Sequence, residues 1–130
     1  MIAIDIDHFK KVNDQHGHHV GDVVLKILAS AMKIWFRETN IVARLGGEEF
    51  TVLLVDTDLR CAHQVADQLV AHIAGTIFPA VGRITISCGV SRLCLAEDGF
   101  SALGRADRAP YRAKSDRRNR SVMLETGIAV

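Results

Sequence analysis

The chain has 130 residues, which suits a single domain because domains commonly span about 100–200 residues. Hydrophobic residues make up 48% of the sequence, enough for one continuous core, and 16 basic and 15 acidic residues leave a formal net charge of +1. A charge so close to zero argues against bulk binding to nucleic acid or to a membrane surface, so an anionic ligand must be held by a local site.

The cysteines and the apolar runs favour a cytoplasmic protein. Cys61, Cys88 and Cys94 are odd in number and form no C-x-x-C pair, so we expect reduced thiols. No positively charged start precedes an apolar signal segment, and no apolar run approaches the roughly 18–20 residues that span a bilayer. We therefore predict a cytoplasmic chain without direct membrane insertion, and a tether on a longer parent protein is compatible with this pattern.

The first third of the chain predicts one strand and two helices. Residues 1–5 have the pattern of a short buried strand that ends in a carboxylate, and a buried strand at a terminus suggests that an upstream segment is missing. Residues 7–14 predict a short helix, and Gly17 and Gly21 are expected to bracket a turn. A long amphipathic helix then ends near residues 39–40. Its buried face follows a three-and-four spacing: Val20, Val24, Ile27, Leu28, Ala31, Ile34 and Trp35.

The middle of the chain predicts a hairpin and a further helix. Residues 41–45 and 49–55 read as strands, and Gly46 and Gly47 between them tolerate the positive φ of a tight turn. Residues 59–75 predict a second amphipathic helix, with apolar residues on one face.

The last third predicts a loop at 76–82, an alternating strand at 83–93, a helix at 101–114 and a strand at 121–125. The expected order is therefore β-α-α-β-β-α-β-α-β, one domain over residues 1–125 with a tail at 126–130. This order predicts an α+β fold, in which helices flank a mixed, largely antiparallel sheet of about five strands.

Two acidic motifs could hold a metal. Asp5 closes the first strand and Lys10 follows it, and a carboxylate at a strand end suits a hard cation such as Mg²⁺. The alternative is that an aspartate of this motif caps the helix. Glu48 and Glu49 lie at the glycine tip of the hairpin, where Gly47 lets a phosphate approach the backbone; the alternative is a solvated acidic tip.

Three further features are ambiguous by themselves. Asn13 and Asp22 could read guanine, whose edge presents N–H donors and an acceptor, although both also suit a turn or a helix start. The basic segment 111–120 could clamp a triphosphate, or could be a solvated helix end. Four histidines without a cysteine or H-E-x-x-H spacing give zinc only weak support: His8, His16, His18 and His19.

Taken in order, these motifs resemble the GGDEF family of diguanylate cyclases. The resemblance rests on D-I-D-H-F-K-K-V-N-D at 5–14, G-H-H-V-G-D at 17–22 and A-R-L-G-G-E-E-F at 43–50. Later segments that agree are S-C-G-V at 87–90, A-D at 106–107, Y-R-A-K at 111–114 and R-N at 118–119. Each motif is weak alone, but all of them in order and at family spacing are specific, and the match spans essentially residues 1–125.

The resemblance implies a palm-like fold, similar to adenylate cyclase and polymerase catalytic cores. It implies Mg²⁺ or Mn²⁺ held by Asp5, the Ile6 carbonyl and Glu48, and Glu49 would share the acidic tip and a second metal. It implies that Asn13 and Asp22 read guanine. The remaining residues implied to contact substrate, chiefly through its phosphates, are Phe9, Lys10, Gly47, Lys114 and Arg118.

The implied reaction joins two GTP molecules into cyclic di-GMP and releases pyrophosphate. Each protomer of a homodimer would hold one GTP, and the 3′-hydroxyl of one nucleotide would attack the α-phosphorus of the other. A regulatory domain in a longer parent protein is the further implied partner.

The sequence departs from the family pattern at four places. It begins after the usual leading helix and D-x-L-T-G-L-x-N-R loop, and Pro110 replaces a leucine inside the last helix, where a kink is expected. Arg117 replaces a glycine. The product-binding motif of the family is R-x-x-D. Here Asn40 stands at the position of its aspartate, three residues after Arg37, so product inhibition through this motif is doubtful.

These departures keep a second hypothesis open. It is a catalytically weak or inactive GGDEF module that binds GTP or acts as a dimerising regulatory element. A nucleotidyl cyclase for another purine is disfavoured by Asn13 and Asp22.

Overall fold

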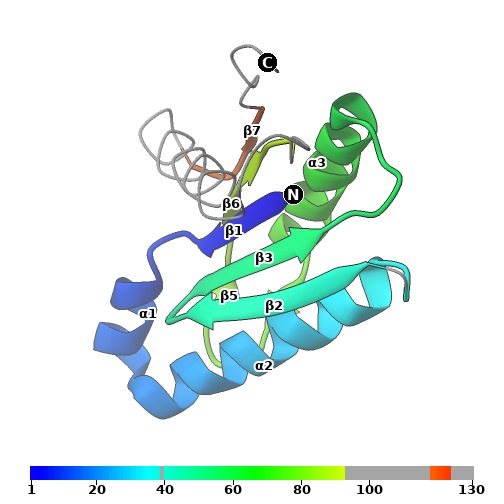
Figure 1. Cartoon of the computed structure of the whole chain (residues 1–130). Coiled ribbons are helices and arrows are strands. Elements are labelled where there is room, and N and C mark those ends of the chain that lie inside the picture. The colour runs from blue at the N-terminus through cyan, green and yellow to red at the C-terminus, as the bar shows by residue number, and fades with distance from the viewer. Residues whose placement is uncertain (39, 93–117, 124–130) are drawn as a thin grey trace.

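A computed structural model describes residues 1–38, 40–92 and 118–123, and its centre is a five-stranded sheet (Figure 1). The strand order is β2-β3-β1-β6-β7, and every neighbouring pair is antiparallel except β6 and β7, which are parallel. The strands are β1 (Ile2–Ile6), β2 (Ile41–Gly46), β3 (Glu49–Leu53), β6 (Ile86–Val90) and β7 (Ser121–Met123). The prediction of a mixed, largely antiparallel sheet with flanking helices is confirmed.

Three helices are described: α1 (Phe9–His16), α2 (His18–Trp35) and α3 (Leu59–Ala74). The predicted order of elements holds over these residues except for an added pair of short strands after α3, and two boundaries of α2 are wrong. The helix begins directly after Gly17 rather than after Gly21, and it ends at Trp35, before the expected 39–40.

The expected loop at 76–82 is also wrong in part, because it contains a small hairpin. β4 (Ile77–Phe78) pairs with β5 (Gly82–Arg83) as a separate two-stranded sheet. The start of the strand expected at 83–93 is therefore wrong, because β6 begins at Ile86. Phe78 is 2% exposed, so burial of one aromatic side chain fixes this short element to the core.

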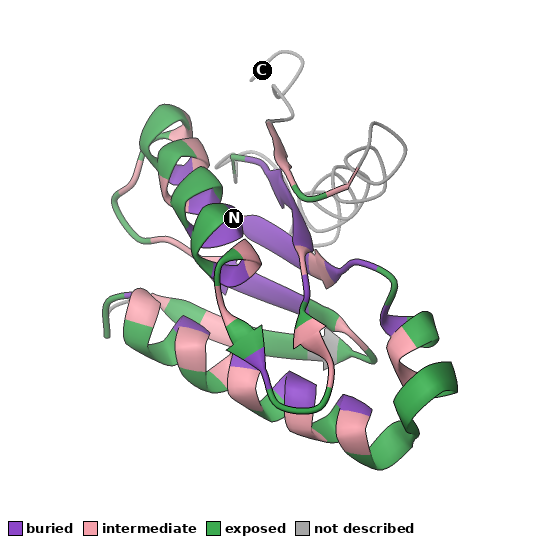
Figure 2. Cartoon of the chain, turned by 180° about the vertical axis from the view of Figure 1, so that it is seen from behind, coloured by how far each residue is buried: buried purple, intermediate pink, exposed green. Residues whose placement is uncertain are grey.

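The core lies between the sheet and the helices α2 and α3. Figure 2 shows buried residues along the central strands and along the inner sides of these helices. Full burial of a Leu or Ile side chain stabilises the fold by about 1.5–3 kcal/mol. The strands contribute Ile2, Ile4, Ile6, Phe50, Val52, Ile86, Cys88 and Val90, and the helices contribute Val24, Leu28, Met32, Ala66, Leu69 and Ile73.

Several predicted features lie outside the described residues. They are the helix at 101–114, its Pro110 and Lys114, the neighbouring Arg117, and the tail at 126–130. Among the residues that are described, no helix is both long enough and apolar enough to cross a bilayer.

Candidate functional site

The two acidic motifs, more than 40 residues apart in sequence, are brought together by the pairing of β1 with β3. In the antiparallel register Asp5 lies directly opposite Glu49. Side chains of such pairs share one face of the sheet, with Cβ atoms about 4.5–5.5 Å apart. Glu48 precedes Glu49 in the turn that joins β2 to β3, and Gly47 has a φ of 46°, which glycine adopts without strain.

A pocket of about 460 Å³ opens beside this acidic edge. It is formed by the first turns of α1, the tip of the β2–β3 hairpin and the turn before β7, and the hairpin tip lies next to α1 in Figure 1. Its lining mixes cationic and acidic side chains, which suits an anion that is accompanied by a cation. The residues are His8, Phe9, Lys10, Lys11, Asp14, Glu48 and Arg118.

Four residues expected at the site from the sequence therefore line one pocket: Phe9, Lys10, Glu48 and Arg118. Arg118 comes from the far end of the chain and has a φ of 61°. Its Nε is buried and has no hydrogen-bond partner among the described residues. A guanidinium on the lining of this pocket offers several N–H donors of fixed geometry to an anion.

The expected guanine-binding residues lie where α1 meets α2. Gly21 is buried in α2, and a Cβ built on it would lie 1.9 Å from Asn13 Oδ1 and 3.2 Å from Phe9 Cζ. Asn13 Oδ1 is itself buried and accepts no hydrogen bond from the part of the chain that is described. The exposed Asp22 follows Gly21 in the same helix. The expectation that Gly21 ends a turn is wrong, because its role is to leave room for the Asn13 carboxamide.

Sequence reasoning missed Asp7. It is 3% exposed, and its carboxylate accepts hydrogen bonds from Thr85 Oγ1, Ser87 Oγ and Asn119 N. The alternative that an aspartate of this motif caps the helix is wrong, since the N-cap of α1 is His8 and no side chain caps it. The available signal was the T-x-S spacing in 85–87, which places two hydroxyl groups on one face of a strand.

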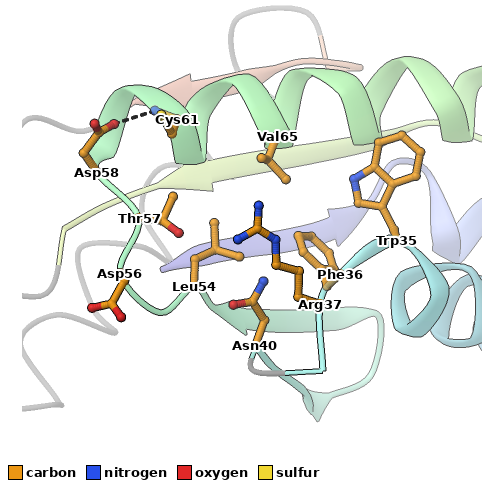
Figure 3. A pocket seen from close by; sticks show the side chains of 10 residues that line it. All are labelled: Trp35, Phe36, Arg37, Asn40, Leu54, Asp56, Thr57, Asp58, Cys61 and Val65. Carbon is orange, nitrogen blue, oxygen red and sulfur yellow. Dashed lines mark hydrogen bonds between the residues drawn. The ribbon is translucent and has the colours of Figure 1, made fainter.

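Arg37 and Asn40 lie at the opposite end of the β2–β3 hairpin. They line a second pocket, of about 300 Å³, together with residues of the β3–α3 connection (Figure 3). In this view the Arg37 side chain reaches toward the middle of the pocket. Asn40 Oδ1 accepts a hydrogen bond from Val55 N at 3.2 Å. Trp35 stacks on His72 with ring centroids 4.9 Å apart.

The described residues contain no group of three or more His, Cys, Asp or Glu side chains that could hold a metal ion. Asp5, Glu48 and Glu49 therefore do not form a cage made of protein alone. Of the cysteines, Cys61 is exposed and Cys88 is buried, and both are free thiols.

A sequence profile of a known protein family identifies the family of this chain. The profile described as "Diguanylate cyclase, GGDEF domain" matches residues 1–120. This chain belongs to the GGDEF domain family.

Relatives of this GGDEF domain include diguanylate cyclases of known sequence and structure. It is 43% identical over 92% of its length to the diguanylate cyclase DgcP of Pseudomonas aeruginosa, and 37% identical over 96% of its length to DgcZ of Escherichia coli. It spans 18% and 43% of these two proteins, so less than half of each.

A solved structure has the same fold. It is the "active GGEEF domain of a diguanylate cyclase from Vibrio cholerae", with a TM-score of 0.88 and 35% identity. The alignment covers 97% of this chain and 82% of that one. The GGEEF sequence in that description is identical to residues 46–50 of this chain.

Proposed function

We propose that this GGDEF domain condenses two GTP molecules into cyclic di-GMP and releases pyrophosphate. The observation that carries the proposal is that Lys10, Glu48 and Arg118 line one pocket beside the Asp5–Glu49 pair. These groups come from four separate segments of the chain, and their convergence provides both signs of charge that a metal-bound triphosphate requires.

The donor chemistry fits a hard divalent cation, Mg²⁺ or Mn²⁺. Asp5, the Ile6 carbonyl and Glu48 offer only oxygen ligands, and Mg²⁺ is commonly held by one or two carboxylates together with substrate phosphates. When bound, such a cation lowers the pKa of an attacking hydroxyl and neutralises charge on the phosphates.

The remaining residues bind and orient the nucleotide. The Asn13 Oδ1 atom, which lacks a partner among described residues, and the Asp22 carboxylate would accept hydrogen bonds from the guanine edge. Lys10 and Arg118 would hold phosphate oxygens, while Gly47 keeps the hairpin tip open, since no atom lies within 4 Å of a Cβ built on it. Lys114 is a further proposed phosphate contact that lies outside the described residues.

Each protomer is proposed to hold one nucleotide, so two protomers are required. With two GTP molecules antiparallel across a homodimer, each 3′-hydroxyl attacks the α-phosphorus of the opposite nucleotide. Each attack forms one P–O bond and breaks the bond to the leaving pyrophosphate. Positioning and charge stabilisation supply most of the rate enhancement. Because the chain spans less than half of its relatives, we further propose a regulatory domain in the parent protein. The reduced thiols expected from the sequence favour a cytoplasmic location.

The second pocket is proposed to be a degenerate product site. Asn40 supplies a neutral carboxamide in place of the family's aspartate, and its oxygen already accepts from Val55 N. Without that carboxylate, inhibition of this GGDEF domain by its own product is expected to be weak.

The deciding experiment incubates the chain with GTP and Mg²⁺ at high protein concentration and measures cyclic di-GMP and pyrophosphate by chromatography. Product that disappears in Asp5→Ala and Glu48→Ala, and persists in the surface variant Glu38→Ala, supports the cyclase. Saturable GTP binding without product would show a binding or dimerising module instead. A chain that does neither would refute both functions.

A further inference from the structure

Both oxygens of the Asp7 carboxylate accept hydrogen bonds from the protein's own donors. Its Oδ1 accepts from Ser87 Oγ at 2.5 Å, and its Oδ2 accepts from Thr85 Oγ1 at 2.7 Å and from Asn119 N at 2.9 Å. The Asp7 backbone N–H donates to Thr85 O at 3.0 Å. A carboxylate that is 3% exposed is tolerated only with such partners. Because both oxygens are bonded within the protein and the side chain is buried, Asp7 is not placed to bind a metal or a substrate.

One of these partners belongs to a turn with an unfavourable backbone. Arg118 and Asn119 are consecutive residues with φ values of 61° and 47°, in the left-handed region that side chains other than glycine rarely adopt. Two hydrogen bonds hold the turn from outside. One is Asn119 N to Asp7, and the other is Cys88 N to Arg120 O at 2.9 Å.

This turn carries Arg118, which lines the 460 Å³ pocket together with Glu48 and Lys10. We propose that Asp7 is a positioning residue, which fixes the 118–119 turn so that the Arg118 guanidinium faces the nucleotide phosphates. The inference rests on the proposed function for the identity of the ligand. It assigns to Asp7 no contact with the nucleotide.

The test compares binding of GTP with binding of guanosine by titration calorimetry, without Mg²⁺ so that no turnover occurs. Asp7→Asn keeps the size of the side chain but presents an NH₂ group where Asn119 N or the hydroxyl groups need an acceptor. We expect the affinity for GTP to fall about tenfold, as for the loss of one charge-assisted contact, and the affinity for guanosine to stay within about twofold.

A double-mutant cycle with Arg118→Ala separates positioning from a general structural effect. If Asp7 acts through Arg118, then Asp7→Asn has no further effect on GTP affinity in the Arg118→Ala background. An effect of Asp7→Asn that is equally large with and without Arg118 overturns the inference.

A matched pair at position 119 tests the same turn with Asp7 intact. Asn119→Gly keeps the backbone donor and favours positive φ, so GTP affinity is expected to be unchanged. Asn119→Ala keeps the donor but disfavours that φ, so GTP affinity is expected to fall as in Asp7→Asn. Equal affinities for these two variants contradict the proposal, even if Asp7→Asn does not fold.

A readout without nucleotide separates this inference from the proposed function. In ¹⁵N-resolved NMR spectra, the Arg118 Nε–H signal should shift in Asp7→Asn and Asn119→Ala and keep its position in Asn119→Gly. If the wild-type chain binds no GTP, the proposed function fails, while these shifts still show that Asp7 sets the position of Arg118. If the signal is insensitive to all three changes, the inference fails, whatever the chain binds.

Discussion

The two ends of the β2–β3 hairpin use their polar groups in opposite ways. At the tip, the pocket lined by Lys10, Glu48 and Arg118 contains a buried Nε without a partner among the described residues. At the other end, Asn40 Oδ1 accepts from Val55 N and Asp58 Oδ1 accepts from Cys61 N. The second pocket is also lined by charged and polar side chains, but Asn40 and Asp58 bind backbone N–H groups and stabilise the local fold. Asn40 and Asp58 thus serve the backbone at one end of the hairpin, whereas the Arg118 Nε has no such bond among the described residues at the other.

The largest difference between the two ends of the hairpin is expected when one carboxylate charge is removed at each of them. Glu48→Gln is expected to lower the rate of cyclic di-GMP formation about 10²–10³-fold, as for loss of one electrostatic group at a reacting centre. Glu38→Gln, at an exposed position near the second pocket, should change it by less than about twofold. The measurement is initial rate by chromatography at equal protein concentration. Similar losses in both variants would mean that the two ends do not differ in function.

A second test fills the space that Gly21 leaves at the tip end. Gly21→Ala places a Cβ 1.9 Å from Asn13 Oδ1, so the carboxamide must move, and overpacking of this kind costs about 1–3 kcal/mol of folding stability. We expect KM for GTP to rise about tenfold. Steady-state kinetics and thermal unfolding measure the two effects.

Gly75→Ala is the matched control, because its nearest neighbour would be Ala71 O at an ordinary 3.6 Å and its φ is −87°. This change should leave KM unaltered and raise stability by about 0.4–1 kcal/mol. An unaltered KM in Gly21→Ala would remove Asn13 from guanine recognition.

A third test asks whether the second pocket can be turned into a binding site. Asn40→Asp supplies a carboxylate and keeps an acceptor for Val55 N, so the rate should begin to decline as cyclic di-GMP accumulates, by about a few-fold. Progress curves with added product measure this. Asn40→Ala, which removes the acceptor, should show no such decline. Strong product inhibition of the unaltered chain would show that the pocket does not need the carboxylate.

The smallest expected effect concerns Asp58, which caps α3. The hydrogen bond that it accepts from the Cys61 backbone N–H holds the Asp58 pKa below its ordinary value of 3.8. Its contribution to stability is therefore present above pH 3.8 and is lost as pH falls through the lowered pKa. Asp58→Ser keeps an N-cap oxygen without a titrating charge.

Near pH 7 the unfolding temperatures of the wild type and of Asp58→Ser should thus be similar. In acid, the unfolding temperature of the wild type should fall relative to that of Asp58→Ser. Thermal unfolding between neutral and acid pH measures it. A difference that does not depend on pH would show that the Asp58 charge is irrelevant to the cap.

The sequence alone predicts those strands, turns and helices whose formation depends on residues close together in the chain. The first strand, the hairpin at Gly46–Gly47 and the amphipathic α3 follow from local alternation, turn chemistry and spacing. The two-residue strands β4 and β5 are too short to leave such a pattern, and Pro79 between them suggests only a loop.

The missed features depend on contacts between distant residues. From its neighbours in sequence, Asp7 looks like a helix cap. Its actual partners are 78, 80 and 112 positions away, so no local pattern reveals them. From its neighbours in sequence, Gly21 looks like a turn residue. A side chain is excluded there only because α1 packs on α2, which the sequence does not show. Asp5 and Glu48 are candidates both from their places at a strand end and a hairpin tip and from the family resemblance, whereas the Asp5–Glu49 register is a property of the folded sheet.

The bond between Asp7 and Asn119 has a consequence for synthesis of the protein. It closes a loop of 112 positions, and the residue that it places, Arg118, faces a pocket whose other walls come from the first 48 residues. A nascent chain on the ribosome can form the first hairpin and helices early, since domains begin to fold during translation. The complete pocket must wait until residues 118–119 have emerged, so a partly synthesised chain would lack the Arg118 wall of the proposed nucleotide site.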